Sequence, residues 1–293
     1  MTTTDDALTY VYAAVPLTTA LRDALKDLRG IHGSPVLSVT APTGTGASTS
    51  PAPGTGGASP PLVFATSHVP RREFNESALK DHFEDLEWLE EVARAHHDVV
   101  QALCAHTTVL PLRLATVYQD DDRAGRALAE QYEAFADRLA QLAAHTEFGV
   151  KIYLTAPAAH TDTDTESVAD ASVTPGKAYL RRRRAQHNAQ EAMYGQAREA
   201  ADIVEAVASR YASQHVRHPA QRGALTGPAE NVLNDAYLVP DAHAKPFRAA
   251  IEEAVGRFDG ISVEVTGPWA PYSFAMPPAE GRNSAADDEE SGR

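Results

Sequence analysis

The order in which strand-like and helix-like segments follow one another most constrains the fold of this chain. An apolar, β-branched segment at 9–15 predicts a buried strand, and 16–30 places leucines on one helical face before a glycine ends the helix. The complete predicted order is strand, helix, strand, strand, helix, strand, helix, and then strand, helix, strand, helix, strand. This order predicts an α+β protein in which helices pack on antiparallel sheets.

A length of 293 residues suggests two domains of ordinary size. The first half matches the split βαβ pattern of ferredoxin-like folds, in which helices cover one face of an antiparallel sheet. We therefore predict a modified ferredoxin-like domain at 1–147 and a smaller α+β domain with a long helix at 148–276. Segments rich in Gly, Pro, Ser, Thr and acidic residues bury nothing, and they predict flexible loops at 40–61 and 156–176 and a disordered acidic tail at 277–293.

Two segments in the first half carry specific expectations. Apolar residues at steps of three and four predict one long helix over 75–106, with Phe83 and Leu86 on its buried stripe. The stretch at 107–118 reads as a strand that Pro111 bends or confines to a sheet edge.

The charge of the chain limits its partners. The net charge is −14 and the isoelectric point about 5.3, a balance that repels nucleic acid and anionic membranes. A single cysteine allows no intrachain disulfide, the first residues lack the pattern of a signal peptide, and no apolar run is long enough to cross a bilayer. We expect a cytoplasmic protein that binds neither nucleic acid nor membrane.

Motifs for catalysis, metal or cofactor are weak. Gly44 and Gly46 lie in a glycine-rich stretch, but no Gly-Lys-Ser/Thr follows and no helix begins there. His96 falls on an apolar helical stripe, where a core histidine is more common than a metal ligand. Cys104 lies in an apolar helical context that favours a small buried hydrophobe. We expect no catalytic residue, no cofactor and no metal.

Two groups of charged residues are candidates for partner contacts. The first is acidic and mainly solvated: Glu84, Glu87 and Glu91 gather on the helix predicted over 75–106, where few basic residues stand at the pairing position. The second is the basic quartet Arg181, Arg182, Arg183 and Arg184 at the start of the long helix, which favours an ion-paired interface over nucleic acid.

The segment 261–275 alternates as a strand and then turns through prolines and aromatic residues. We interpret it as the closure of the second domain. Trp269 and Tyr272 would cover the core of that domain, and Pro271, with the proline before the tryptophan, would fix the exit of the chain. A direct contact of this turn with a partner is the alternative.

Six stretches in the same order resemble the GvpL/GvpF family of gas vesicle proteins. They cover nearly the whole chain between 9 and 275 apart from the two predicted loops, and the insertion at 40–61 and the acidic tail depart from the family pattern. The stretches are YVYAAV, LVFATSHVP, LKDHFEDLEWLEEVARAHHDVVQAL with TVLPLRLATVY, GKAYLRRRR, LNDAYLVP and VTGPWAPYSF.

The resemblance implies an accessory or minor structural protein of gas vesicle formation without a catalytic site. Such a protein would bind the small hydrophobic shell protein GvpA and other accessory proteins during nucleation and assembly, at the gas vesicle and in the cytoplasm. The fold alone also allows a ferredoxin-like small-molecule sensor or enzyme, which stays open as the alternative.

Overall fold

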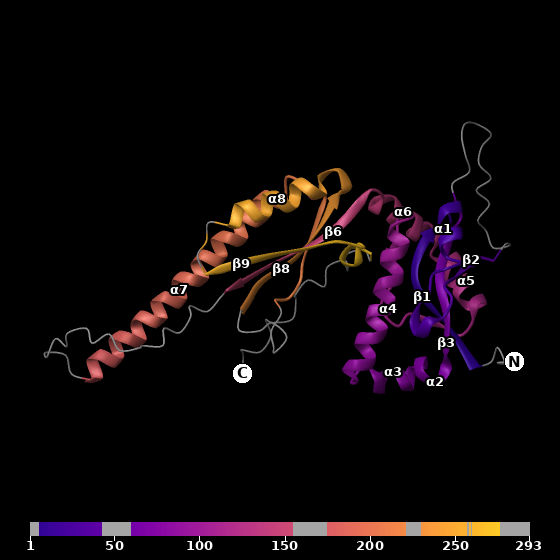
Figure 1. Cartoon of the computed structure of the whole chain (residues 1–293), viewed down its shortest axis with the longest axis horizontal. Helices are drawn as coiled ribbons and strands as arrows, with labels where there is room; N and C mark the ends of the chain where they lie inside the picture. Colours follow the sequence, from indigo (N-terminus) through magenta and orange to yellow (C-terminus); the bar gives the residue numbers. More distant parts are fainter. Residues whose placement is uncertain are drawn as a thin grey trace, which may run out of the picture. The chain divides into compact units, whose positions relative to one another are not determined.

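The computed structural model describes residues 6–42, 60–154, 175–220, 230–256, 258 and 260–275 (Figure 1). These residues form two compact units. The first comprises the described residues up to Ala144 together with those from Trp269 onward, and the second runs from His145 to Pro268. The loops predicted at 40–61 and 156–176 and the tail predicted at 277–293 lie largely or wholly outside the described residues.

The first unit contains an antiparallel sheet in the order β2-β3-β1-β4, with β5 also paired to β1. This order is that of the predicted split βαβ pattern. The central strand β1 has buried side chains on both faces, so the sheet needs a cover on each side. The strands are β1 Ala7–Pro16, β2 Leu37–Thr40, β3 Leu62–Pro70, β4 Leu110–Pro111 and β5 Val117–Tyr118.

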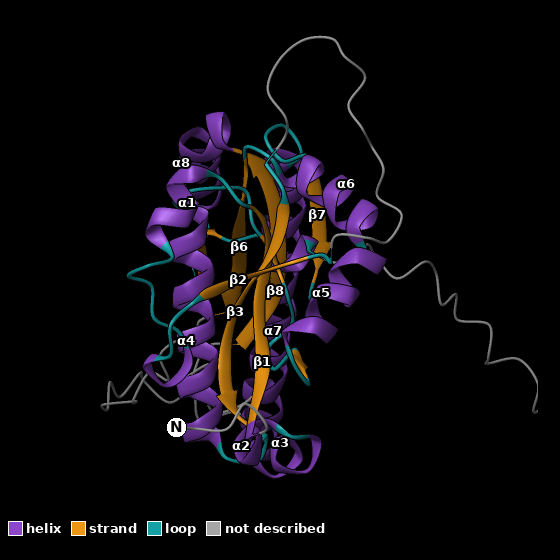
Figure 2. Ribbon diagram, turned by 90° about the vertical axis from the view of Figure 1, so that its right-hand side faces the viewer, coloured by secondary structure: helices purple, strands orange, loops and turns teal. Residues whose placement is uncertain are grey.

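Helices cover both faces of this sheet (Figure 2). α4 packs with α1 on the face that carries Tyr10 and Tyr12, and α5 and α6 cover the other face, where Phe64 meets Phe135. The prediction of helices on one face alone was therefore wrong for this unit. The helices are α1 Thr19–Ala24, α2 Arg71–Phe74, α3 Glu76–His82, α4 Leu86–Cys104, α5 Asp121–Glu130 and α6 Tyr132–Leu142.

The helix predicted over 75–106 is broken before Leu86. Asp85 has an extended backbone, and its carboxylate accepts the N–H groups of Glu87 and Trp88, so it caps a new helix and stops the previous one. The break turns Phe83 and Leu86 outward, where their side chains are 48% and 77% exposed. Their predicted place on a buried stripe was wrong because the stripe assumed an unbroken helix.

The second unit repeats the strand order of the first. Its sheet runs β7-β8-β6-β9, so that in both units the second strand is followed by the third, the first and the fourth. The long helix α7 and the helix α8 pack on the face of the sheet that carries Val150, Tyr237 and Val239. The elements are β6 His145–Leu154, α7 Pro175–Ala208, β7 Gln214–Arg217, β8 Glu230–Pro240, α8 Ala244–Val255 and β9 Ile261–Trp269.

A glycine near the end of β9 allows this strand to approach β6 closely. Gly267 has φ +111°, and a Cβ atom at this position would lie 2.7 Å from the carbonyl oxygen of Glu147. Both conditions exclude an ordinary side chain, so only glycine fits where the chain leaves the second sheet.

The segment that follows β9 packs on the first unit and not on the second. Ala270 and Phe274 are buried there, the N–H of Ala270 donates to Oε1 of Gln101 at 2.9 Å, and Nε of Arg138 donates to the carbonyl oxygen of Phe274 at 2.5 Å. Tyr272 packs against the same core.

The predicted closure of the second domain by this segment was therefore wrong. Trp269 is 40% exposed and meets the ring of His97, so it covers no core of the second unit. Pro271 precedes a short 3-10 turn at Tyr272–Phe274 that places Phe274 inward. Alternation and rigid residues predicted the strand and the turn correctly, but they carry no information about which core the turn covers.

Phe274→Ala should lower the free energy of unfolding by about 3 kcal/mol, because it leaves a cavity at a fully buried aromatic site. Trp269→Ala is the matched control and should cost about 1 kcal/mol, since its side chain is substantially exposed. Urea unfolding monitored by circular dichroism measures both values. Equal losses for the two variants would contradict the placement of this segment.

Candidate functional site

The basic quartet lies near the start of α7. The side chains of Arg181, Arg183 and Arg184 are exposed, and Arg182 occupies the same helical turn. Two large apolar side chains stand directly before them, Tyr179 at 62% and Leu180 at 64% exposure. We call Tyr179, Leu180, Arg181, Arg183 and Arg184 the basic helix end. The structure thus adds an apolar component that the charge pattern alone did not predict.

The acidic candidates lie at the break between α3 and α4. Glu84, Glu87 and Glu91 are all exposed, and the outward-facing side chains of Phe83 and Leu86 directly precede Glu84 and Glu87 in the sequence. We call these five residues the acidic corner. It belongs to the first unit, whereas the basic helix end belongs to the second. Each surface therefore combines one sign of charge with two exposed apolar side chains.

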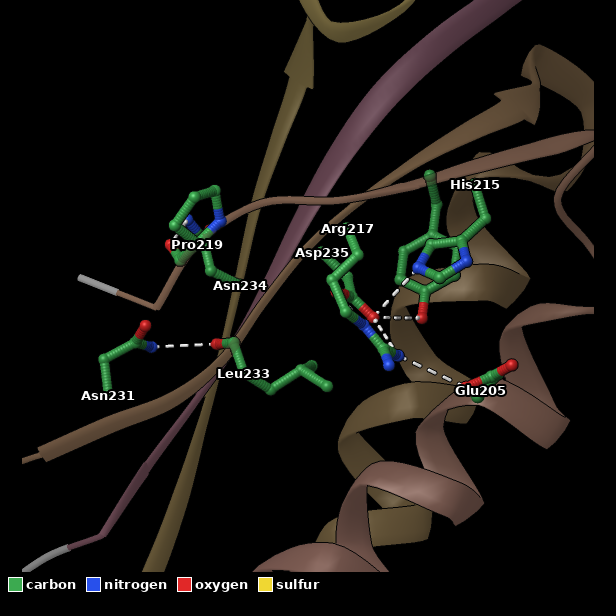
Figure 3. A network of polar contacts seen from close by, with 9 residues as sticks. Glu205, His215, Arg217, Pro219, Asn231, Leu233, Asn234 and Asp235 are labelled. Carbon is green, nitrogen blue, oxygen red and sulfur yellow. Dashed lines mark hydrogen bonds and ion pairs between the residues drawn. The ribbon is translucent and has the colours of Figure 1, made fainter. Parts of the chain in front are cut away.

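A buried carboxylate in the second unit was not predicted. The side chain of Asp235 on β8 is fully buried. Arg217 on the edge strand β7 donates two hydrogen bonds to it, from Nε to Oδ1 at 3.0 Å and from Nη2 to Oδ2 at 3.1 Å (Figure 3). His215 Nε2 lies 2.9 Å from Oδ2, and the hydroxyl of Tyr237 donates to the same oxygen at 3.3 Å. Nη2 of Arg217 also reaches Glu205 on α7 at 3.2 Å.

The electrostatics of this network favour a structural brace. The hydrogen bonds to Asp235 hold the pKa of Arg217 well above its usual range, and burial together with the negative charge of Asp235 raises the pKa of Tyr237. Both groups therefore keep their protons at neutral pH and continue to donate to the carboxylate. Because these donors already occupy its oxygens, Asp235 has little capacity to act as a general base.

Strand register explains why these side chains meet. Arg217 lies opposite Asp235, and His215 lies opposite Tyr237, on one face of the β7–β8 pair. The ring of His215 stacks on that of Tyr237 at 4.7 Å. β7 was not predicted because it has only four residues. The available signal was the alternation of polar and apolar residues at His215, Val216 and Arg217.

The first unit buries a histidine beside two tyrosines. The hydroxyl of Tyr10 accepts the N–H of Ala115 at 3.0 Å and lies 2.9 Å from Nδ1 of His96. Burial lowers the pKa of His96 to about 4, with a further contribution from His97. His96 is therefore neutral in the folded chain at neutral pH, and its Nδ1 atom shares a hydrogen bond with the hydroxyl of Tyr10. This agrees with the prediction of a core histidine.

The remaining predicted chemistry finds little support. Cys104, at the end of α4, is an exposed residue and not a buried one as expected, although neighbouring groups keep enough water from its thiol to raise the pKa of that thiol to about 11. Gly44 and Gly46 lie outside the described residues. Within the described ranges, no three His, Cys, Asp or Glu side chains gather in a way that would hold a metal. No helix in those ranges combines the length and apolar content needed to cross a bilayer.

A groove of about 490 Å³ lies in the second unit between α7 and the strands β7 and β8. Charges of both signs line it, among them Arg198, Asp202 and Arg217. The hydroxyl of Tyr194 donates to Glu230 at 2.7 Å on its wall. Arg217 and Glu205 form an ion pair at 3.2 Å on the same wall, so its charges are partly balanced by one another.

Comparison with known proteins gives a consistent result. The GvpL/GvpF family model, described as gas vesicle synthesis protein GvpL/GvpF, matches residues 8–276. Gas vesicle protein L of Streptomyces sp. (strain CB03234) is 40% identical over 215 residues, which are 73% of this chain and 80% of that protein. Gas vesicle protein L1 of Halobacterium salinarum is 27% identical over 205 residues, 66% of this chain and 73% of that one.

Two crystal structures share the fold. GvpF from Anabaena sp. PCC7120 superposes with a TM-score of 0.58 at 18% identity and covers 94% of this chain and 99% of its own. GvpF from Microcystis aeruginosa gives a TM-score of 0.55 at 16% identity, with 92% and 99% covered. At these identities the comparison establishes the fold, which extends over nearly the whole chain.

Arg217→Gln should lower the free energy of unfolding by about 2 kcal/mol, because it removes the cation from a buried carboxylate while His215 and Tyr237 remain as partners. Arg210→Gln, an exposed arginine near the end of α7, is the control and should change stability by less than about 0.5 kcal/mol. Chemical denaturation tests both. Equal stability of the two variants would show that the network is no brace.

The stability of the first unit should depend on pH through His96. Burial lowers its pKa from the ordinary value of 6.5 to about 4, so the unfolded chain binds the proton more readily than the folded chain. The contribution is fully present above pH 6.5 and is lost as the pH falls toward 4, by up to about 3 kcal/mol.

His96→Gln should remove this part of the pH dependence, whereas His106→Gln, which changes an exposed histidine, should behave like the wild type. The measurement is the free energy of unfolding in urea across this pH range. A profile unchanged by His96→Gln would exclude burial of a neutral histidine.

Proposed function

The chain belongs to the GvpL/GvpF family of gas vesicle synthesis proteins and has a gas vesicle role, and we propose that it is an accessory or minor structural protein that binds the hydrophobic shell protein GvpA and other vesicle proteins during nucleation and assembly. The observation that carries this proposal is the family match, which spans both units and the closing segment from residue 8 to 276. The proposed place of action is the cytoplasm and the forming vesicle.

Exposed apolar side chains beside charges support a binding role. A protein that handles an apolar, aggregation-prone partner needs apolar contact area that stays soluble until the partner arrives. Phe83 and Leu86 supply such area at the acidic corner, and Tyr179 and Leu180 supply it at the basic helix end. We propose both surfaces as partner contacts.

The proposal includes no catalytic step. Asp235 supports this part of the proposal. A buried carboxylate could otherwise suit acid/base chemistry, but His215, Arg217 and Tyr237 already contact its two oxygens. The alternative, a small-molecule sensor or enzyme, would use the groove between α7 and the strands β7 and β8. Its mixed charges would accept a polar ligand.

Co-expression with GvpA followed by pull-down tests the binding role. The wild-type chain should capture GvpA and keep it soluble. The pair Phe83→Ser and Leu86→Ser should weaken binding by roughly 30-fold, because two exposed apolar side chains that each contribute roughly 1 kcal/mol together supply about 2 kcal/mol to such a contact. Leu37→Ser is the matched control, since Leu37 is also an exposed leucine of the first unit.

Failure of the wild-type chain to capture GvpA or any other vesicle protein would contradict the binding role. It would also favour the alternative, a small-molecule sensor or enzyme that binds its ligand in the groove. Equal capture by the serine pair and by the Leu37→Ser control would contradict the assignment of the contact to Phe83 and Leu86.

A further inference from the structure

The first half of α7 has no partner within its own unit. Every described side chain from Lys177 to Ala192 is exposed, and the buried residues of the helix begin at Ala197. The helix continues past the ends of the strands that its second half covers (Figure 1). Residues 175–192 span about 27 Å at the helical rise, and helices in proteins gain most of their stability from packing, which this half lacks within its own unit. A packing partner would supply the stability that this half lacks.

The chemistry of this half defines that partner. Arg181, Arg183 and Arg184 form no ion pair with any described residue, and two exposed apolar side chains stand beside them. Nearby, only His187 and Glu191 pair along the described part of the helix. A fitting partner presents several unpaired carboxylates around a small apolar surface.

The acidic corner of the same chain has this composition. Glu84, Glu87 and Glu91 have no cationic partner among the described residues, whereas the neighbouring Glu90 is already paired with Arg94. The exposed side chains of Phe83 and Leu86 neighbour Glu84 and Glu87 in the sequence. Its three carboxylates and two apolar side chains match, in number and kind, the described side chains of the basic helix end.

We propose that the basic helix end of one copy docks on the acidic corner of a second copy. The contact is heterologous, because it joins two different surfaces, and a chain that uses both can link to a neighbour on either side. The apolar side chains of both surfaces are covered in the contact, and the free helix half gains a packing surface. In this way copies of the chain shield each other's exposed apolar side chains when no client is bound.

The size of the surfaces sets the strength of the contact. Two apolar side chains and three charges on each side are less than the roughly 800 Å² per partner that a stable interface buries. The contact is therefore weak and reversible, and it is strongest at low salt, where exposed charges are least screened. The proposed contact is inferred from the basic helix end and the acidic corner alone, and it does not depend on the proposed binding of GvpA.

Sedimentation velocity of the purified full-length chain tests the contact. The weight-average mass should rise with concentration at about 0.05 M salt, and the rise should disappear at about 0.5 M. Two charge-reversal variants, the acidic reversal and the basic reversal, should each weaken association by about tenfold or more. They are Glu84→Lys with Glu87→Lys and Glu91→Lys, and Arg181→Glu with Arg183→Glu and Arg184→Glu.

Two further samples separate complementarity from net charge. An equimolar mixture of the two reversal variants should associate again, because each reversed surface meets its opposite on the other variant. A chain that carries all six substitutions keeps the wild-type net charge and should also associate. Circular dichroism checks that each variant is folded. We expect folded variants because all six substituted residues are exposed.

Three results would overturn the proposal. The first is a wild-type chain that stays monomeric at low salt. The second is association that neither reversal weakens or that the mixture does not restore. The third is a salt-dependent change in shape without any dependence on concentration, which would place the contact within one chain. Because GvpA is absent from this experiment, its failure leaves the pull-down result independent.

Discussion

The burial of β1 on both faces is the constraint on which the first unit depends. The side chains from Tyr10 to Val15 are completely buried, so the sheet requires α1 and α4 on one side and α5 and α6 on the other. The tyrosines on this strand also carry hydroxyl groups into the core, and each hydroxyl has partners, which include the N–H of Ala115 for Tyr10 and that of Ile31 for Tyr12. Ala270 and Tyr272 join the core beside these tyrosines after the chain has built the second unit.

The second unit repeats the strand order with a different balance of contacts. Its edge strand β7 is short, and the network around Asp235 joins β7, β8 and α7. The burial of α7 begins only at Ala197, so the half that precedes it carries the basic helix end as an exposed surface. The repeated topology therefore supplies two scaffolds with different exposed surfaces.

Sequence periodicity predicted most of the strands and helices, but it did not predict which side chains are exposed at the helix break or which side chains meet across the strands. Strands such as 9–15 and 261–269 were predicted because burial imposes composition and alternation on them. Apolar spacing missed the break before Leu86, because the local cap by Asp85 overrides a continuous stripe. It assigned the turn after β9 to the wrong core, because that choice depends on tertiary contacts alone. The Asp235 network was missed since it requires the register of two distant strands.

The most direct test of the proposed role is vesicle formation in a host from which the gene for this chain has been deleted. Electron microscopy would count vesicles in cells complemented with the wild-type chain, with the Leu37→Ser control, or with Phe83→Ser and Leu86→Ser together. We expect normal vesicles with the first two and few with the third, at equal levels of folded protein. Normal vesicles in the deleted host without complementation would contradict the role in vesicle formation.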